Sequence, residues 1–180
     1  MTWQPPPDPT KIWFPAWDLI PPPIGSRIAG FGYARGQVNT PNDGVEVKVA
    51  LDPRTTVGEV VEIYLKGRDR LLPFPCFRTN ARFDPGMSGG PVFDETGRFC
   101  GLICSNLPPS DEGEDHVSWV TLLWPSLAVQ VNADREGYTK DVKYPVHELA
   151  RDQFLHINGW ERFGISDDGR PFFRWDKSPT

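Results

Sequence analysis

One short stretch combines a nucleophile with residues that make a sharp turn: Gly86-Met87-Ser88-Gly89-Gly90-Pro91. Acyl transfer by serine needs a hydroxyl on such a turn, with backbone N–H groups converging where the tetrahedral oxyanion forms. Gly86 allows its N–H to lie beside that of Ser88, and Gly89 and Gly90 allow a strand or a substrate to approach closely. The stretch is therefore typical of a turn that supports acyl transfer by Ser88.

The same letters also fit Gly-x-Ser-x-Gly, the nucleophile elbow of α/β-hydrolases. That elbow is followed by a helix, whereas here the segment 91–93 reads as a strand and leads into the turn Asp94-Glu95-Thr96-Gly97. No alternation of strands with crossover helices surrounds it. The local pattern therefore disfavours the hydrolase elbow and predicts a hairpin directly after the serine.

Other side chains offer little further chemistry. His116 ends an acidic loop and is interpreted as an exposed loop residue, with a catalytic role as the minor alternative. His147 and His156 flank a predicted helix, where packing or surface positions are expected, and their spacing does not suit a shared metal. Asp84 and Asp94 are interpreted as turn residues.

The three cysteines predict free thiols in a reducing compartment rather than a disulfide framework. Cys100 and Cys104 lie four residues apart in a predicted strand, too far along an extended backbone to be bridged. No further Cys or His lies close enough in sequence to complete a tetrahedral metal site. We expect neither a metal nor another cofactor.

The serine lies within residues 24–132, where short β-type runs are punctuated by Gly, Pro, Asn and Asp. Val45, Val47 and Val49 alternate with charged residues, and this period of two indicates strands with one buried face. The predicted strands are 27–33, 44–51, 57–65, 76–82, 91–93, 99–105 and 116–122. Several evenly spaced strands predict an all-β fold, an antiparallel barrel or sandwich.

The two flanking regions differ in composition from this segment. Residues 1–23 begin and end with proline triplets and form an extended lead-in, whose Ile12 to Trp17 we expect to pack against a core. A short helix is predicted over 125–131. The tail, 133–180, is expected to hold a helix over 145–156 and a hairpin over 157–175, with its aromatic residues packed on the barrel.

Charge and hydropathy exclude two classes of partner. The net charge is −5 and the pI is about 5.2, with no long cluster of basic residues, so nucleic acid is not expected. The sequence has no signal-peptide pattern at its start and no apolar run of bilayer-crossing length. We therefore expect no membrane association and a cytoplasmic location.

The stretch from Phe83 to Phe93, followed by Gly97 to Ile103, resembles the active-serine region of trypsin-like (chymotrypsin-fold) serine peptidases. The match covers Gly-x-Ser-Gly-Gly-Pro and the glycine-containing strand after it. The resemblance implies that residues 24–132 correspond to the C-terminal, serine-bearing Greek-key barrel of that family. It also implies that Ser88 is the nucleophile, and that the N–H groups of Gly86 and Ser88 form the oxyanion hole.

Residues of the substrate pocket follow from the same resemblance. Arg82 would lie at the base of the primary pocket, with Cys104, Ser105 and Asn106 forming one edge. An arginine at the base would suit acidic substrates or fill the pocket. Met87 replaces the aspartate that secreted members use to receive a freed amino terminus, so that route of activation is not expected.

The family orders its triad as His, Asp and Ser, whereas the first histidine in this sequence is His116. Without a base, Ser88 is a weak nucleophile.

Two hypotheses for the function follow. The first is a serine endopeptidase, truncated here, that lacks the His/Asp barrel and is inactive alone. Its partners would be that barrel and a polypeptide substrate. The second is an inactive trypsin-like module for protein binding or scaffolding, which could dimerise through its open barrel face.

Overall fold

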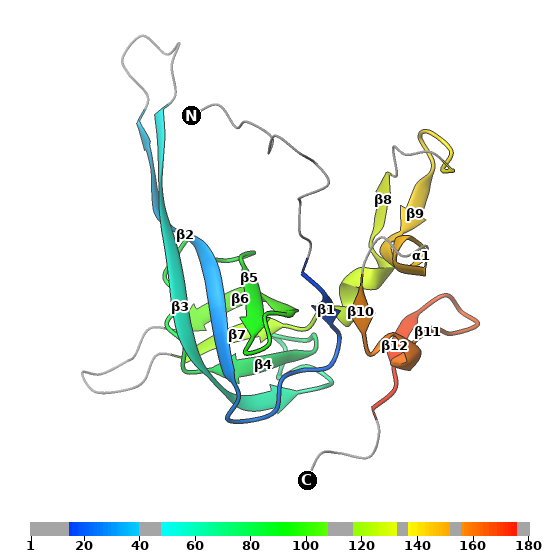
Figure 1. Ribbon diagram of the computed structural model, residues 1–180, viewed down its shortest axis with the longest axis horizontal. Coiled ribbons are helices and arrows are strands. Elements are labelled where there is room, and N and C mark those ends of the chain that lie inside the picture. Colours follow the sequence, from blue (N-terminus) through cyan, green and yellow to red (C-terminus); the bar gives the residue numbers. More distant parts are fainter. Residues whose placement is uncertain (1–14, 40–47, 108–116, 133–136, 152–155, 176–180) are drawn as a thin grey trace.

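The computed structural model describes residues 15–39, 48–107, 117–132, 137–151 and 156–175, and its main feature is a closed antiparallel barrel (Figure 1). Six strands follow one another around the barrel in the order β6-β5-β2-β3-β4-β7, and a further pairing of β6 with β7 closes the ring. The strands are β2 (Arg27–Asn39), β3 (Lys48–Tyr64), β4 (Cys76–Thr79), β5 (Pro91–Asp94), β6 (Phe99–Leu107) and β7 (Val117–Thr121). The predicted all-β Greek-key barrel is confirmed.

The strand order places the candidate nucleophile on a crossing connection. β4 precedes β5 in the chain, but β4 lies between β3 and β7, whereas β5 lies between β2 and β6. The chain must therefore cross from one part of the barrel to another between Thr79 and Pro91. Ser88 lies on this Greek-key connection. The connection joins β4 and β5, which do not pair with each other and therefore form no hairpin.

Strand β3 is longer than the sequence pattern predicts. The predicted strands 44–51 and 57–65 are parts of one strand, β3, apart from residues 44–47, which lie outside the described residues. Pro53, between the two predicted strands, lies opposite Tyr33 of β2, in a part of β3 that β4 does not reach. Proline is tolerated there because the outer edge has no ladder hydrogen bond to lose.

The barrel core is built from the inward-facing residues of the six strands. In β2, Ile28, Gly30, Gly32 and Ala34 are buried and alternate with more exposed residues, as period-two alternation requires. The buried core comprises Ile28, Ala34, Val60, Phe77, Ala81, Phe83, Met87, Val92, Cys100, Ile103, Val120 and Leu122. Phe83 and Met87 come from the connection that carries Ser88, so this connection is packed into the core.

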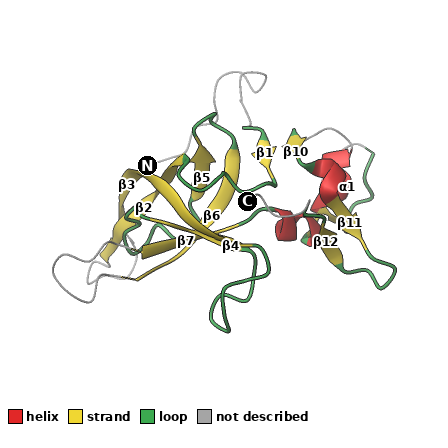
Figure 2. Ribbon diagram, turned by 90° about the horizontal axis from the view of Figure 1, so that it is seen from below, coloured by secondary structure: helices red, strands yellow, loops and turns green. Residues whose placement is uncertain are grey.

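Segments from before and after the barrel meet beside it. Strand β1 (Trp17–Asp18) pairs in parallel with β6 and with β10 (Ile157–Asn158). Figure 2 shows the C-terminal elements together on one side of the barrel. They are η2 (Trp124–Ala128), β8 (Gln130–Asn132), β9 (Lys143–Pro145), α1 (Val146–Arg151), η3 (Trp160–Arg162), β11 (Phe163–Ile165) and β12 (Pro171–Phe173).

The helices differ from those that the sequence predicts. The predicted helix over 125–131 is a 3-10 helix that ends at Ala128, where Val129 takes an extended conformation and leads into β8. The predicted helix over 145–156 is described only as α1, six residues long, since 152–155 lie outside the described residues. The predicted terminal hairpin is present as β11 and β12. None of the described helices is long and apolar enough to cross a membrane.

Candidate active site

Ser88 is the second residue of the later of two consecutive tight turns, 84–87 and 87–90, within the segment 83–90, which we call the serine turn. The Met87 N–H donates to the Asp84 carbonyl at 3.1 Å, and the Gly90 N–H donates to the Met87 carbonyl at 2.9 Å. The third residue of each turn is a glycine with positive φ, +98° at Gly86 and +83° at Gly89. This pattern, with Pro85 at the second position of the first turn, is typical of type II turns. Ser88 therefore occupies a corner, and its side chain is exposed.

The N–H groups of the serine turn divide into two kinds. Those of Met87 and Gly90 close the two turns, and that of Gly89 donates to the Ile103 carbonyl of β6 at 2.8 Å. For the N–H groups of Gly86 and Ser88, no acceptor is found among the described residues. These are the two groups that the resemblance assigns to the oxyanion hole. Since no described residue accepts from them, both N–H groups are available to a developing oxyanion.

The inner face of β2 supports the serine turn with glycines. The ring of Phe83 occupies the space that a side chain at Gly30 would need, and a Cβ at Gly32 would lie 2.9 Å from the Cα of Met87. Gly90 in turn packs against the Phe31 carbonyl, so closely that a side chain at Gly90 would collide with it. Alternate glycines on β2 therefore make room for the two bulky side chains that anchor the serine turn.

Asp84, predicted as a turn residue, is a buried carboxylate with two cationic partners. Its Oδ2 lies 3.0 Å from Nη1 of Arg54, and its Oδ1 lies 3.0 Å from Nε of Arg82. The Asp84 side chain is only 8% exposed, whereas both arginines reach solvent. Arg54 comes from β3, where it lies opposite Gly32. The β2 and β3 residues at this register therefore contact two different residues of the serine turn, Met87 and Asp84.

The residues assigned to a substrate pocket lie in two parts of the barrel, Arg82 on the connection before β5 and the other three on β6. Arg82 is exposed and bound to Asp84. Cys104 is half-buried at a bulge of β6, beside Trp119 and Cys76, while Ser105 and Asn106 follow it as β6 residues paired with β7. Ser118 of β7 is fully buried and accepts a hydrogen bond from the Phe83 N–H at 3.4 Å. The pocket assignment stays a prediction.

No described histidine contacts the serine turn. His147 lies in α1, where its Nδ1 is 3.2 Å from the Leu127 carbonyl and its ring packs at 5.7 Å from that of Phe163. His156 is exposed, and its carbonyl accepts a hydrogen bond from the Trp17 N–H. His116 lies outside the described residues. The two described histidines thus have structural positions in the C-terminal region.

The three cysteines are free thiols. Cys76 and Cys100 are fully buried, and desolvation raises the pKa of both thiols, that of Cys76 to about 11. Burial also raises the pKa of Cys104. A buried thiol with a raised pKa is a poor nucleophile because little thiolate is present at neutral pH. None of the three cysteines competes with Ser88 as a candidate nucleophile.

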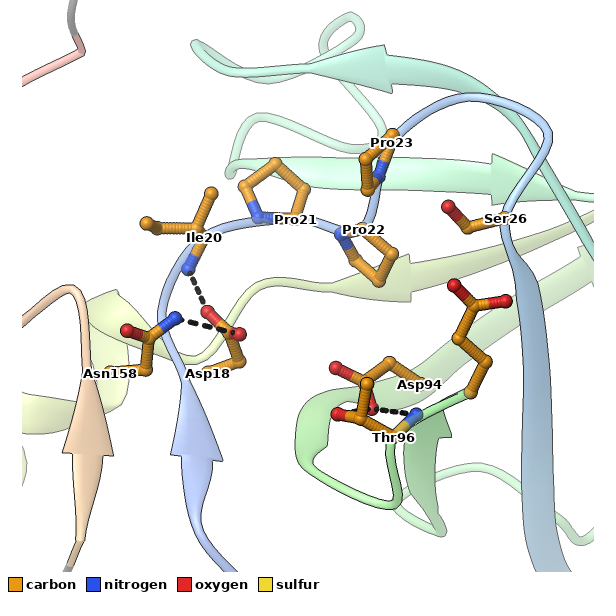
Figure 3. A pocket seen from close by; sticks show the side chains of 10 residues that line it. Asp18, Ile20, Pro21, Pro22, Pro23, Ser26, Asp94, Thr96 and Asn158 are labelled. Atoms are coloured by element: carbon orange, nitrogen blue, oxygen red, sulfur yellow. Dashed lines mark hydrogen bonds between the residues drawn. The ribbon is translucent and has the colours of Figure 1, made fainter.

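A cavity of about 240 Å³ lies elsewhere, between the lead-in and the turn that joins β5 to β6 (Figure 3). It is lined by Asp18, Ile20, Pro21, Pro22, Pro23, Ser26, Asp94, Glu95, Thr96 and Asn158. Asp18 accepts hydrogen bonds from the Ile20 N–H and the Asn158 side chain, and Asp94 accepts from Thr96 and the Arg98 N–H. These carboxylates already have partners, and no residue of the serine turn lines the cavity.

Sequence reasoning missed Arg54, Gly30 and Gly32 as parts of the candidate site. A signal for the glycines was present, since Gly30 and Gly32 occupy alternate positions of a predicted strand, where small residues permit close approach. For Arg54 no local signal existed, because its contact with Asp84 joins residues 30 positions apart.

Comparisons with known proteins give a family match and similar solved structures. The family model described as a trypsin-like peptidase domain matches residues 8–102, just over half of the chain and including the serine turn. A search of the curated proteins gives no match. Among solved structures, the chain is similar to Rv3671c from M. tuberculosis H37Rv, crystallised as the inactive form of a serine-to-alanine mutant. The two are 18% identical with a TM-score of 0.38.

The aligned region covers 60% of this chain and 47% of the Rv3671c chain, so the present sequence spans less than half of that structure. The family match covers β1 to β5, the serine turn and the first part of β6. By this match, the chain belongs to the trypsin-like peptidase domain family.

Proposed function

We propose that this chain is the serine-bearing module of a trypsin-like serine endopeptidase, in which Ser88 is the nucleophile. The observation that supports this most strongly is which N–H groups of the serine turn donate hydrogen bonds within the chain and which do not. The N–H groups of Gly86 and Ser88 lie on either side of the Met87 N–H in the chain, and the Met87 N–H donates a hydrogen bond to the Asp84 carbonyl. An exposed serine whose own N–H and the Gly86 N–H bond to no acceptor among the described residues has the groups that a nucleophile with its oxyanion hole requires.

The proposed reaction is peptide hydrolysis through an acyl-enzyme. Ser88 Oγ attacks the scissile carbonyl carbon and loses its proton to a base, while the carbonyl π electrons move to the oxygen, which the Gly86 and Ser88 N–H groups stabilise. The C–N bond then breaks, and the base returns the proton to the leaving amine. Water attacks the acyl group in the same way, releasing the second product and restoring Ser88.

We further propose that the base is supplied by a partner barrel carrying His and Asp. Neither described histidine is positioned as that base. The His147 ring bonds to the Leu127 carbonyl, and His156 is exposed beside β10. Without a base, the Ser88 hydroxyl stays protonated and weakly nucleophilic at neutral pH. On this proposal the chain alone has little or no peptidase activity.

Labelling with a fluorophosphonate probe tests both parts, with Ser88→Ala as the matched control. The wild-type chain alone should label slowly or not at all. Adding imidazole, which can act as a diffusible base, should produce labelling that the Ser88→Ala variant lacks. Labelling of the wild-type chain without imidazole, lost in Ser88→Ala, would show that the chain holds its own base. That outcome would overturn the proposal that a partner barrel supplies the base, and it would support the proposal that Ser88 is the nucleophile.

The alternative is a non-catalytic module for protein binding or scaffolding. An exposed aromatic pair supports it: Phe31 and Tyr33 of β2 are 37% and 46% exposed and pack edge to face at 5.6 Å. Val57 of β3 is also exposed, and lies opposite Ala29 on the same pair of strands. A partner protein or a second copy of the chain would cover this apolar surface. Absence of Ser88-dependent labelling with imidazole would favour this alternative.

A further inference from the structure

The carboxylate of Asp84 connects the serine turn to the barrel wall. One of its oxygens binds Arg82, only two residues away, but the other binds Arg54 of β3 at 3.0 Å. The first contact is local, because Arg82 directly precedes the serine turn in the chain. The second joins two elements that are 30 residues apart in sequence. Arg54 is therefore the contact through which β3 can influence the serine turn.

Fixing Asp84 also constrains the backbone around the proposed oxyanion hole. The Asp84 carbonyl accepts the hydrogen bond that closes the first turn, and the Asp84 N–H lies 3.3 Å from Sδ of Met87. Pro85 follows with its φ angle restricted by the ring. The orientation of the next peptide group, which carries the Gly86 N–H, then depends on how Asp84 is held.

The burial of Asp84 distinguishes this pair from an ordinary surface ion pair. Exposed pairs such as Arg54 with Asp52 contribute little because water competes for both charges. Asp84 is 8% exposed, so loss of one cationic partner leaves a buried carboxylate with its charge less compensated. Such a carboxylate gains stability by moving toward water. That movement would open the first turn.

We propose that Arg54 is a positioning residue for the oxyanion hole. Through Asp84 it holds the serine turn in the form that keeps the Gly86 and Ser88 N–H groups free of internal hydrogen bonds. The uncharged Met87 side chain, buried in the core against Gly32, cannot supply such an electrostatic anchor. This inference rests on the proposed function for its catalytic meaning, but its structural part can be tested without activity.

The structural test is amide hydrogen exchange by NMR on the full chain, comparing wild type with Arg54→Gln. Exchange of the Met87 and Gly90 N–H groups, which close the two turns, should become about tenfold faster or more, because opening no longer breaks a charge-assisted contact. The Gly97 N–H, which closes the turn between β5 and β6, serves as an internal reference and should not change.

Asp52→Asn is the matched control, because Asp52 binds Nε of the same guanidinium, whereas Asp84 binds Nη1. It should leave exchange in the serine turn at the wild-type rate. Faster exchange only in Arg54→Gln supports the inference. Unchanged exchange at Met87 and Gly90, even with a lower melting temperature, overturns it and makes the pair a general stabilising contact.

A second variant keeps the test independent of any one substitution. Asp84→Asn keeps the side-chain shape but removes the charge that both arginines bind, and it should also speed exchange at Met87 and Gly90. If imidazole supports labelling of wild type, Arg54→Gln should lower the Ser88 labelling rate about tenfold at saturating probe with little change in half-saturation. A rate equal to wild type would overturn the positioning role, whereas absent wild-type labelling would count against the proposed function alone.

Discussion

Gly32 of β2 lies against Met87 of the serine turn so closely that a Cβ on the glycine would be 2.9 Å from the Met87 Cα. The obstacle is backbone, which cannot rotate away as a side chain can. At Gly30 the obstacle is instead the ring of Phe83, a side chain. The two glycines therefore support neighbouring parts of one site but should respond differently to substitution.

We expect Gly32→Ala to lower the free energy of unfolding by about 1–3 kcal/mol, the usual cost of overpacking a core. Denaturant unfolding measures this change. Replacing Phe83 with the smaller leucine should partly restore the stability of Gly30→Ala, because space is then available. No equivalent rescue of Gly32→Ala is expected from Met87→Leu, and a full rescue would contradict the backbone contact.

The buried thiol of Cys76 predicts a loss of stability in alkaline solution. Its pKa is about 11 in the folded chain against an ordinary value of 9.0, so between these pH values the folded chain keeps a proton that the unfolded chain releases. The free energy of unfolding should therefore fall as pH rises through this interval, by at most about 1.4 kcal/mol per pH unit for this thiol. Below pH 9 the effect is absent.

Denaturant unfolding at several pH values from 8 to 11 measures that slope. Cys76→Ala should make the slope shallower without abolishing it, because burial also raises the pKa of the Cys100 and Cys104 thiols. Tyr64→Phe is a useful comparison, since the hydrogen bond with Glu62 also raises the pKa of Tyr64. A wild-type slope in Cys76→Ala would assign the alkaline loss to other groups.

Two adjacent phenylalanines in β12 provide a matched test of how the C-terminal elements pack. Phe173 is 7% exposed and stacks on Trp124 of η2 at 6.0 Å, whereas Phe172 is 38% exposed. Phe173→Ala should cost about 3–5 kcal/mol, as expected for a buried phenylalanine. Phe172→Ala should cost much less. Equal losses, measured by thermal or denaturant unfolding, would contradict the described packing of β12 on η2.

Much of the barrel could be predicted because its signals are local. Alternation of Val49 and the valines before it with charged residues predicts part of β3, and Asp94 to Gly97 predicts the hairpin of β5 and β6. In the structure, Oδ1 of Asp94 accepts hydrogen bonds from the N–H groups of Thr96 and Arg98, which explains the turn chemistry. The serine turn was predictable for the same reason. Its glycines are visible in the sequence, and in the structure Gly86 and Gly89 adopt the positive φ angles that such turns need.

What could not be predicted depends on pairings between distant segments. The ring closes through β6 and β7, and β3 continues through Pro53 because, among the described residues, no strand pairs there with the side of β3 that faces away from β2. Asp84 shows the same limit within the site. Its type and spacing indicate a turn residue, and only the folded barrel brings Arg54 to it. Local patterns carry no information about such partners.

The pairing of β1 with β10 determines the order in which the molecule can assemble. Trp17 and Ile157 are neighbours in this pair, and the Asp18 and Asn158 side chains, 140 residues apart, share a hydrogen bond. Contacts of such long sequence separation form slowly, since the intervening chain must first be confined. The barrel contacts span far shorter separations. Folding should therefore close the barrel first and join the two flanking segments last, as a separate kinetic phase.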